Sequence, residues 1–86
     1  MYWISNEQMI KLQSDLGTYL IKQDAQGYVS LEWRTVLYQS VKDVATSVLK
    51  CLDMFYVRIV EMEGSSSADH NGIYYTKIII YIDQTK

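Results

Sequence analysis

Residues 73–83 are the stretch that most limits what this chain can fold into, because apolar residues alternate along most of their length. Successive side chains of a β-strand point to opposite faces, so Ile78 and Ile80 share one face and the residues between them share the other. Residues 54–63 are similarly rich in β-branched and aromatic side chains, which suit strands. The two segments predict a long antiparallel hairpin, joined by a loop of small polar residues at 64–72.

The two arms of this hairpin can be paired by matching their apolar residues. The predicted pairs are Ile59 with Ile78, Val57 with Ile80 and Phe55 with Ile82. A shift of one residue would move every side chain to the other face, so the apolar pattern decides which face is the core. The second face then carries tyrosines, cations and aliphatic residues, which are Tyr56, Arg58, Met62, Tyr75, Lys77, Ile79 and Tyr81.

The first part of the chain has the apolar spacing of a helix. Ser5 followed by Gln8 is the pattern of a capping box, which predicts a helix start at this point. The spacing fades over residues 23–26, and Gly27 predicts the end of this helix because glycine readily ends helices.

Residues 28–34 are open to two interpretations. The alternation of Val29, Leu31 and Trp33 with polar residues favours a short strand. We prefer a second helix that begins at Ser30, because helical spacing continues downstream of it. The apolar stripe of that helix would consist of Leu37, Val41, Val44, Val48 and Leu52.

The predicted fold is a single α+β domain, residues 1–86, in which two N-terminal helices pack on a C-terminal antiparallel β-hairpin. If residues 28–34 form a strand, the order becomes α-β-α-β-β. A chain of 86 residues builds one modest core, and a two-stranded sheet alone is marginally stable in water. We therefore expect a homodimer, formed across the second face or by joining hairpin edges into a larger sheet.

Composition narrows the class of protein. A formal net charge of −2 disfavours a surface devoted to phosphate contacts. The N-terminus lacks the basic and apolar segments of a signal peptide, and no apolar run approaches the roughly 20 residues of a membrane span. Cys51 is the single cysteine, which excludes an intrachain disulfide and agrees with a reducing compartment. We expect a cytoplasmic protein that does not contact membranes.

Motifs that carry catalysis or bind phosphate are absent from the sequence. His70 lies beside Asp69 and near Glu61 and Glu63, where a metal ion or a general base can be imagined. We interpret this segment as a solvated turn, because no ligand spacing recurs elsewhere. We interpret Cys51 as a small apolar residue near a helix end. The sequence therefore predicts no catalytic residue, no metal and no cofactor.

The second face of the hairpin is then the best candidate for function. Tyrosine, methionine and arginine are enriched at protein interfaces. We expect a small non-enzymatic protein-binding module, of inhibitor or immunity type, that binds a larger protein through this face. One alternative is a nucleic-acid-binding module that stacks bases on the same tyrosines. Another is a small enzyme with a site near His70. A further interpretation is that the first helix covers this face within the chain.

Overall fold

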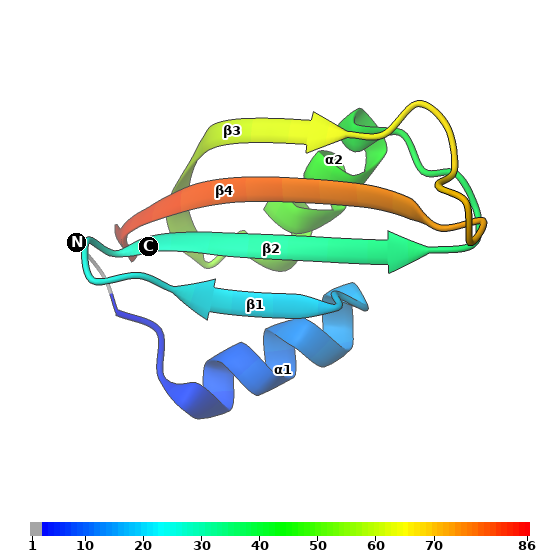
Figure 1. The fold of residues 1–86 in the computed structure, drawn as a ribbon. Helices are drawn as coiled ribbons and strands as arrows, with labels where there is room; N and C mark the ends of the chain where they lie inside the picture. The colour runs from blue at the N-terminus through cyan, green and yellow to red at the C-terminus, as the bar shows by residue number, and fades with distance from the viewer. Residues whose placement is uncertain (1–2) are drawn as a thin grey trace.

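The computed structural model describes residues 3–86 and shows two helices and one four-stranded antiparallel sheet (Figure 1). The elements are α1 (Asn6–Leu16), β1 (Leu20–Gln23), β2 (Tyr28–Thr35), α2 (Val41–Cys51), β3 (Phe55–Gly64) and β4 (Tyr74–Thr85). The strand order is β1-β2-β4-β3, so β4 pairs with β2 as well as with β3. The predicted α+β class is confirmed, but the predicted order is wrong, because the strands β1 and β2 separate the two helices.

The start of α1 has the predicted capping box. The backbone N–H of Gln8 donates to Oγ of Ser5 at 3.2 Å, and the backbone N–H of Ser5 donates to Oε1 of Gln8 at 3.1 Å. These two bonds satisfy N–H groups that a helix start otherwise leaves without partners. The local sequence is therefore sufficient to fix where this helix begins.

The end of α1 lies at Leu16 and not near Gly27, so the predicted helix is too long. Gly17 has a left-handed backbone conformation with φ of 67°, and its N–H donates to the carbonyl oxygen of Gln13 at 2.9 Å. Glycine adopts this conformation at little cost, which makes it a common helix terminator. The chain then enters β1, a strand that the apolar spacing did not predict.

Residues 28–35 form strand β2, so the preferred helix start at Ser30 is wrong and the alternative of a short strand is confirmed. Leu31 is fully buried in this strand, where it pairs with Ile78 of β4. Pairing and burial between two neighbouring strands outweigh the helical spacing that follows in the sequence. Helix α2 begins after Ser40 instead, and the side chain of Ser40 makes no capping hydrogen bond.

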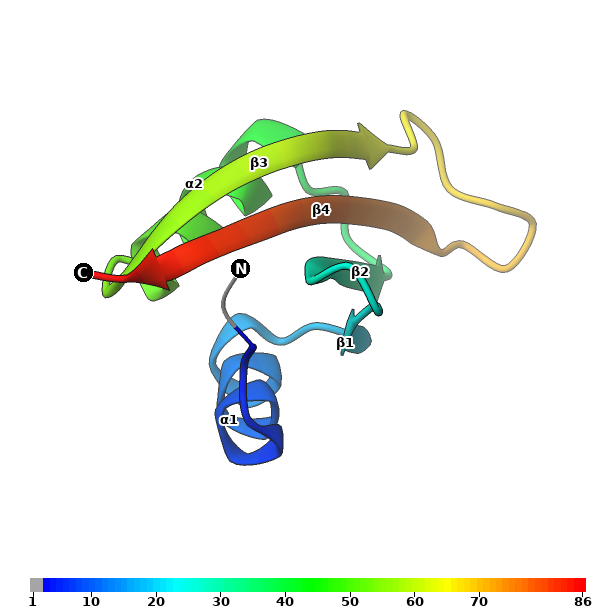
Figure 2. The ribbon, with the colours of Figure 1, turned by 90° about the vertical axis from the view of Figure 1, so that its left-hand side faces the viewer.

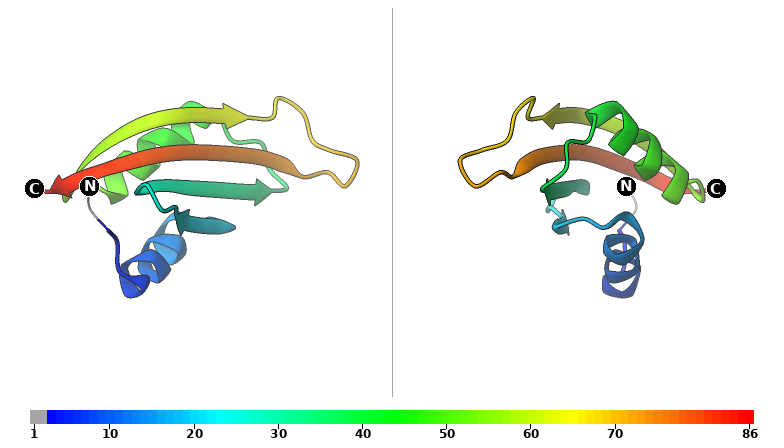
Figure 3. Two further views of the ribbon diagram at one scale, coloured as in Figure 1. Left: turned by 60° about the vertical axis from the view of Figure 1, so that its left-hand side comes forward. Right: turned by 90° about the vertical axis from the view of Figure 1, so that its right-hand side faces the viewer.

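Both helices pack on the same face of the sheet, as Figure 2 and both views of Figure 3 show. The indole Nε1 of Trp33 on β2 donates to the carbonyl oxygen of Leu16 in α1 at 3.1 Å. Val48 of α2 and Leu52 just after it are almost fully buried in the same core. The core consists of Ile4, Leu12, Ile21, Val29, Leu31, Trp33, Val44, Ala45, Val48, Leu52, Phe55, Ile78, Ile80 and Ile82. The first helix therefore does not cover the second face of the hairpin.

The predicted faces of the first half of the β3–β4 hairpin are confirmed, but its predicted register is wrong. Ile59 pairs with Ile80 and Val57 pairs with Ile82, each two residues beyond the predicted partner. Because strand side chains repeat every two residues, a shift of two leaves each side chain on its predicted face. The apolar pattern alone cannot distinguish these two registers.

A β-bulge at Val60 changes the face of the residues that follow it. The pairing shifts at this point, so that Glu61 lies opposite Ile79 and Met62 lies opposite Ile78. Met62 therefore lies on the helix side of the sheet, and its predicted place on the second face is wrong. An extra residue in one strand reverses the alternation beyond it, and period-2 reasoning assumes that no such residue exists.

The connection between β3 and β4 contains a turn organised by one carboxylate. Oδ1 of Asp69 accepts hydrogen bonds from the backbone N–H groups of Asn71 at 2.8 Å and Ile73 at 2.9 Å. The bond from Ile73 contributes most to a lowered pKa of the Asp69 carboxyl group. Gly72 follows with φ of 79° and completes the turn. The small polar residues of this segment predict a loop but not this turn.

The uneven covering of the sheet predicts different costs for two adjacent isoleucines. Ile80→Ala should lower the free energy of unfolding by about 2–4 kcal/mol, because Ile80 is fully buried under the helices. Ile79→Ala should cost clearly less, because Ile79 lies on the other face and is only half-buried. Urea unfolding followed by circular dichroism measures both. Equal costs in a monomeric sample would mean that the chain also covers the other face.

The Asp69 turn predicts a stability difference that depends on pH. Asp69→Ala should lower the melting temperature slightly at neutral pH, whereas His70→Ala should leave it unchanged, since only Asp69 holds the turn. The lowered pKa of Asp69 means that its contribution is present above the ordinary value of 3.8 and is lost as the pH falls below it. The two variants should therefore melt alike in strong acid. An equal effect of both variants at neutral pH would contradict this role.

Candidate functional site

The sheet face that points away from both helices is the candidate functional site, and we call it the open face. Figure 1 looks onto it, with α2 behind the sheet. The strand registers place on it Leu20, Lys22, Tyr28, Ser30, Glu32, Arg34, Tyr56, Arg58, Glu61, Glu63, Tyr75, Lys77, Ile79 and Tyr81. Within residues 3–86, neither helix packs against this face. Its side chains meet solvent or one another.

One row of the open face joins three strands through aromatic contacts. The rings of Tyr28 on β2 and Tyr81 on β4 lie 5.3 Å apart with an interplanar angle of 54°. Tyr81 also lies beside Arg58 of β3, which is on the opposite side of β4 from β2. The guanidinium of Arg58 lies 5.4 Å from the centre of the Tyr81 ring. Tilted aromatic pairs and cation–π contacts are each worth about 0.5–1.5 kcal/mol. The row therefore consists of side chains that contact one another across three strands.

The middle of the open face alternates between aliphatic and charged side chains. Ile79 lies between Ser30 of β2 and Glu61 of β3. In the next row, Lys77 lies between two carboxylates, Glu32 and Glu63. Lys77 therefore has an acid as its neighbour on each side in the sheet.

The far end of the open face is fixed by a hydrogen bond between two strands. The hydroxyl of Tyr75 on β4 donates to Oε1 of Glu32 on β2. Beside it, the guanidinium of Arg34 lies 4.3 Å from the centre of the Tyr19 ring. Burial first, and then the bond to Glu32, raise the pKa of Tyr75 to about 12. Tyr75 is therefore a neutral donor across the physiological range of pH.

The near end of the open face is slightly hollowed. The hollow is lined by Tyr56, Val57, Arg58, Tyr81 and Asp83. Tyr56 is 51% exposed, and its ring lies 5.7 Å from Nζ of Lys86. A large, exposed aromatic side chain beside a hollow is a typical feature of a surface that meets another molecule.

Six of the seven predicted site residues share the open face, and Met62 is the exception. The prediction missed the contribution of β2, whose residues Tyr28, Glu32 and Arg34 complete the aromatic and charged rows. The signal was present, because these residues alternate with buried Val29 and Trp33. The predicted helix from Ser30 is incompatible with this alternation.

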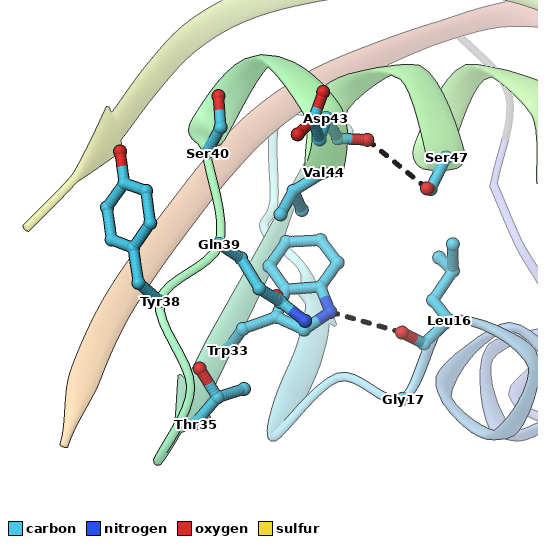
Figure 4. A pocket seen from close by; sticks show the side chains of 10 residues that line it. All are labelled: Leu16, Gly17, Trp33, Thr35, Tyr38, Gln39, Ser40, Asp43, Val44 and Ser47. Atoms are coloured by element: carbon cyan, nitrogen blue, oxygen red, sulfur yellow. Dashed lines mark hydrogen bonds between the residues drawn. The ribbon is translucent and has the colours of Figure 1, made fainter.

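A second concave site lies on the helix side, between the end of α1, the end of β2 and the start of α2 (Figure 4). It is a cavity of about 480 Å³ and includes the Trp33 indole in its wall. Two of the residues that line it have titratable side chains, Asp43 and Tyr38. None of the seven site residues predicted from the sequence lines it.

The other residues considered from the sequence remain apart. His70 is exposed in the turn between β3 and β4, and Cys51 is a free, half-buried thiol at the end of α2. Across residues 3–86, no group of three or more His, Cys, Asp and Glu side chains could hold a metal ion. Neither α1 nor α2 is long and apolar enough to cross a membrane.

The contact between Tyr75 and Glu32 predicts a late tyrosine titration. The raised pKa means that the neutral phenol contributes stability below the ordinary value of 10, and that this contribution is lost as the pH rises towards 12. Ultraviolet titration of the phenolates should show one tyrosine of the eight ionising last. Glu32→Gln should shift that step to lower pH, and Tyr75→Phe should remove it. Tyr56→Phe is the control that should leave it in place, and a late step that survives Tyr75→Phe would contradict the assignment.

No protein-family model matches the chain, and neither a curated protein nor a solved structure is found to be similar to it.

Proposed function

We propose that this chain is a non-enzymatic protein-binding module that attaches to a larger protein through the open face, in the manner of an inhibitor or immunity protein. The observation that carries the proposal is the position of the helices. Both pack on one side of the sheet, and the described residues leave a tyrosine-bearing face without cover on the other. Solvent contact of such a surface is a cost that binding a partner would remove.

The side chains of the open face suit a protein partner. Tyrosine and arginine are the residues most enriched among those that dominate binding energies. Tyr28, Tyr81 and Arg58 already restrain one another through ring and cation contacts. Binding would therefore lose less side-chain entropy than at a surface of free rotamers. The partner surface should combine an apolar centre with charges of both signs.

The same charges make a nucleic-acid partner the weaker proposal. A phosphate backbone approaching Lys77 would also approach Glu32 and Glu63, its neighbours in the sheet. Phosphate binders gain affinity by clustering cations and releasing counterions, which interleaved carboxylates oppose. Stacking of bases on Tyr28 or Tyr81 would have to overcome this repulsion.

We also propose a cytoplasmic location. The free thiol of Cys51 is half-buried at the end of α2, and it has no second cysteine in the chain to pair with. Free thiols persist in reducing compartments. A partner protein of the same compartment is the simplest assumption for the binding experiment.

Affinity capture followed by measurement with a purified partner tests the proposal. The tagged chain is used to capture proteins from the native cell, with and without nuclease, and the captured protein is then purified and titrated by calorimetry. Tyr56→Ala and Tyr81→Ala should each raise the Kd about 30-fold, corresponding to about 2 kcal/mol for a central interface tyrosine. Ile10→Ala is the matched control, because Ile10 is exposed on α1, away from the open face.

Three results would contradict this function. One is a partner that disappears with nuclease treatment, which would favour nucleic acid. Another is a protein partner whose affinity is unchanged by both tyrosine variants. The third is an equal loss of affinity with Ile10→Ala, which would place the contact on the helix side of the molecule.

A further inference from the structure

Strand β3 forms one edge of the sheet along its whole length. The strand order β1-β2-β4-β3 leaves β3 paired with β4 on one side only, and β3 has 10 residues. The opposite edge is β1, which has 4 residues. A long edge strand presents unpaired N–H and C=O groups that can pair with another chain. β3 is therefore the edge at which a further strand is best accommodated.

The backbone groups that face outward along β3 can be assigned from the pattern of its bonds to β4. The N–H of Ser65 donates to the carbonyl oxygen of Tyr75 at 2.9 Å, so these residues form a hydrogen-bonded pair. Such pairs alternate with non-hydrogen-bonded pairs in an antiparallel ladder. Met62, opposite Ile78, belongs to the second kind, so its N–H and C=O point away from β4. The same alternation on the other side of the bulge directs the backbone of Ile59 outward.

The charges of β3 are complementary to those of a second, reversed copy of the same strand. Arg58 lies in the first half of the strand, and Glu61 and Glu63 lie in the second half, all on the open face. Arg58 contacts the ring of Tyr81 and forms no ion pair with a carboxylate among residues 3–86. An antiparallel pairing of two copies brings cation opposite acid at both ends of the contact. Opposite charges across strands stabilise a sheet, and like charges destabilise it.

We propose that a second copy of this chain pairs with β3 in antiparallel orientation, edge to edge, and joins the two sheets into one. Ile59 of each copy lies opposite Met62 of the other. In this register the outward N–H and C=O groups of the two residues can form hydrogen bonds with each other. This register places Arg58 of each copy opposite Glu63 of the other. The two bulges at Val60 then face each other at the two-fold axis, so neither interrupts the pairing on its own.

Exposed apolar side chains beside this edge support the same occupant. Val60 is 49% exposed and Met62 is 45% exposed, although both belong to a strand next to the core. Leu49 of α2 is also exposed and lines a hollow with Val57 beside the same edge. A second copy would remove part of this apolar surface from water, which favours association.

The edge-to-edge dimer differs from a face-to-face dimer in what it leaves free. Pairing through β3 keeps both open faces accessible and sets them side by side on one continuous sheet. Pairing through the open faces would instead bury the surface assigned to a partner protein. The dimer proposal does not depend on that assignment, because its test needs no partner.

Sedimentation equilibrium on the full chain, with a charge-swap series, tests the dimer. The wild type should associate with a Kd in the micromolar range or below. Arg58→Glu and Glu63→Arg should each weaken association at least tenfold, because each puts like charges opposite each other twice. The double variant Arg58→Glu with Glu63→Arg should restore the wild-type Kd to within about threefold. If either change weakened association by disturbing the fold of the monomer, the two losses of affinity would add in the double variant, and the wild-type Kd would not be restored.

Ile79→Lys is the control for the alternative geometry, because Ile79 lies in the middle of the open face and not at the edge. It should leave the dimer unchanged. A wild type that remains monomeric at hundreds of micromolar would overturn the proposal, and so would a double variant as weak as the single ones. Loss of the dimer in Ile79→Lys alone would show a face-to-face contact. Circular dichroism spectra confirm that each variant is folded before its association is interpreted.

Discussion

Burial of one face of β4 is the constraint on which the rest of this structure depends. Ile78, Ile80 and Ile82 are fully buried, and β4 pairs with a strand on each side. Three branched aliphatic side chains in one strand need a cover, and both helices provide it from the same side. With α1 and α2 used in this way, the described chain has no helix left for the opposite face.

The open face follows from that arrangement and explains why its side chains look unlike either a core or an ordinary surface. They are partly ordered by contacts among themselves, such as Tyr28 with Tyr81 and Tyr75 with Glu32. A fully solvated sheet face would be expected to carry mainly small and charged residues. Tyrosine rings that contact one another across neighbouring strands have less freedom to lose, which favours binding because less entropy is lost.

The sequence predicts those features that depend on local chemistry or on a period of two. The capping box at Ser5 and the core faces of Val57 and Ile80 belong to this group. Features decided by distant pairing were missed. The segment 28–35 is a strand because it pairs with β4, which is distant in the sequence. Met62 lies on the opposite face from the predicted one because of one bulge. Apart from Met62, the predicted site residues of the hairpin lie on the open face, and the residues that β2 adds to this face were missed.

The topology of the sheet has a consequence for how the chain reaches this fold. The hairpins β1–β2 and β3–β4 each join segments that are close in sequence, whereas β2 pairs with β4 through residues as distant as Tyr28 and Tyr81. Local hairpins form within microseconds, but pairing of distant segments must first overcome loop-closure entropy. We therefore expect docking of the two hairpins to be the slow step. During synthesis on the ribosome, β2 leaves before β4, so its apolar side is exposed to other chains until β4 has followed.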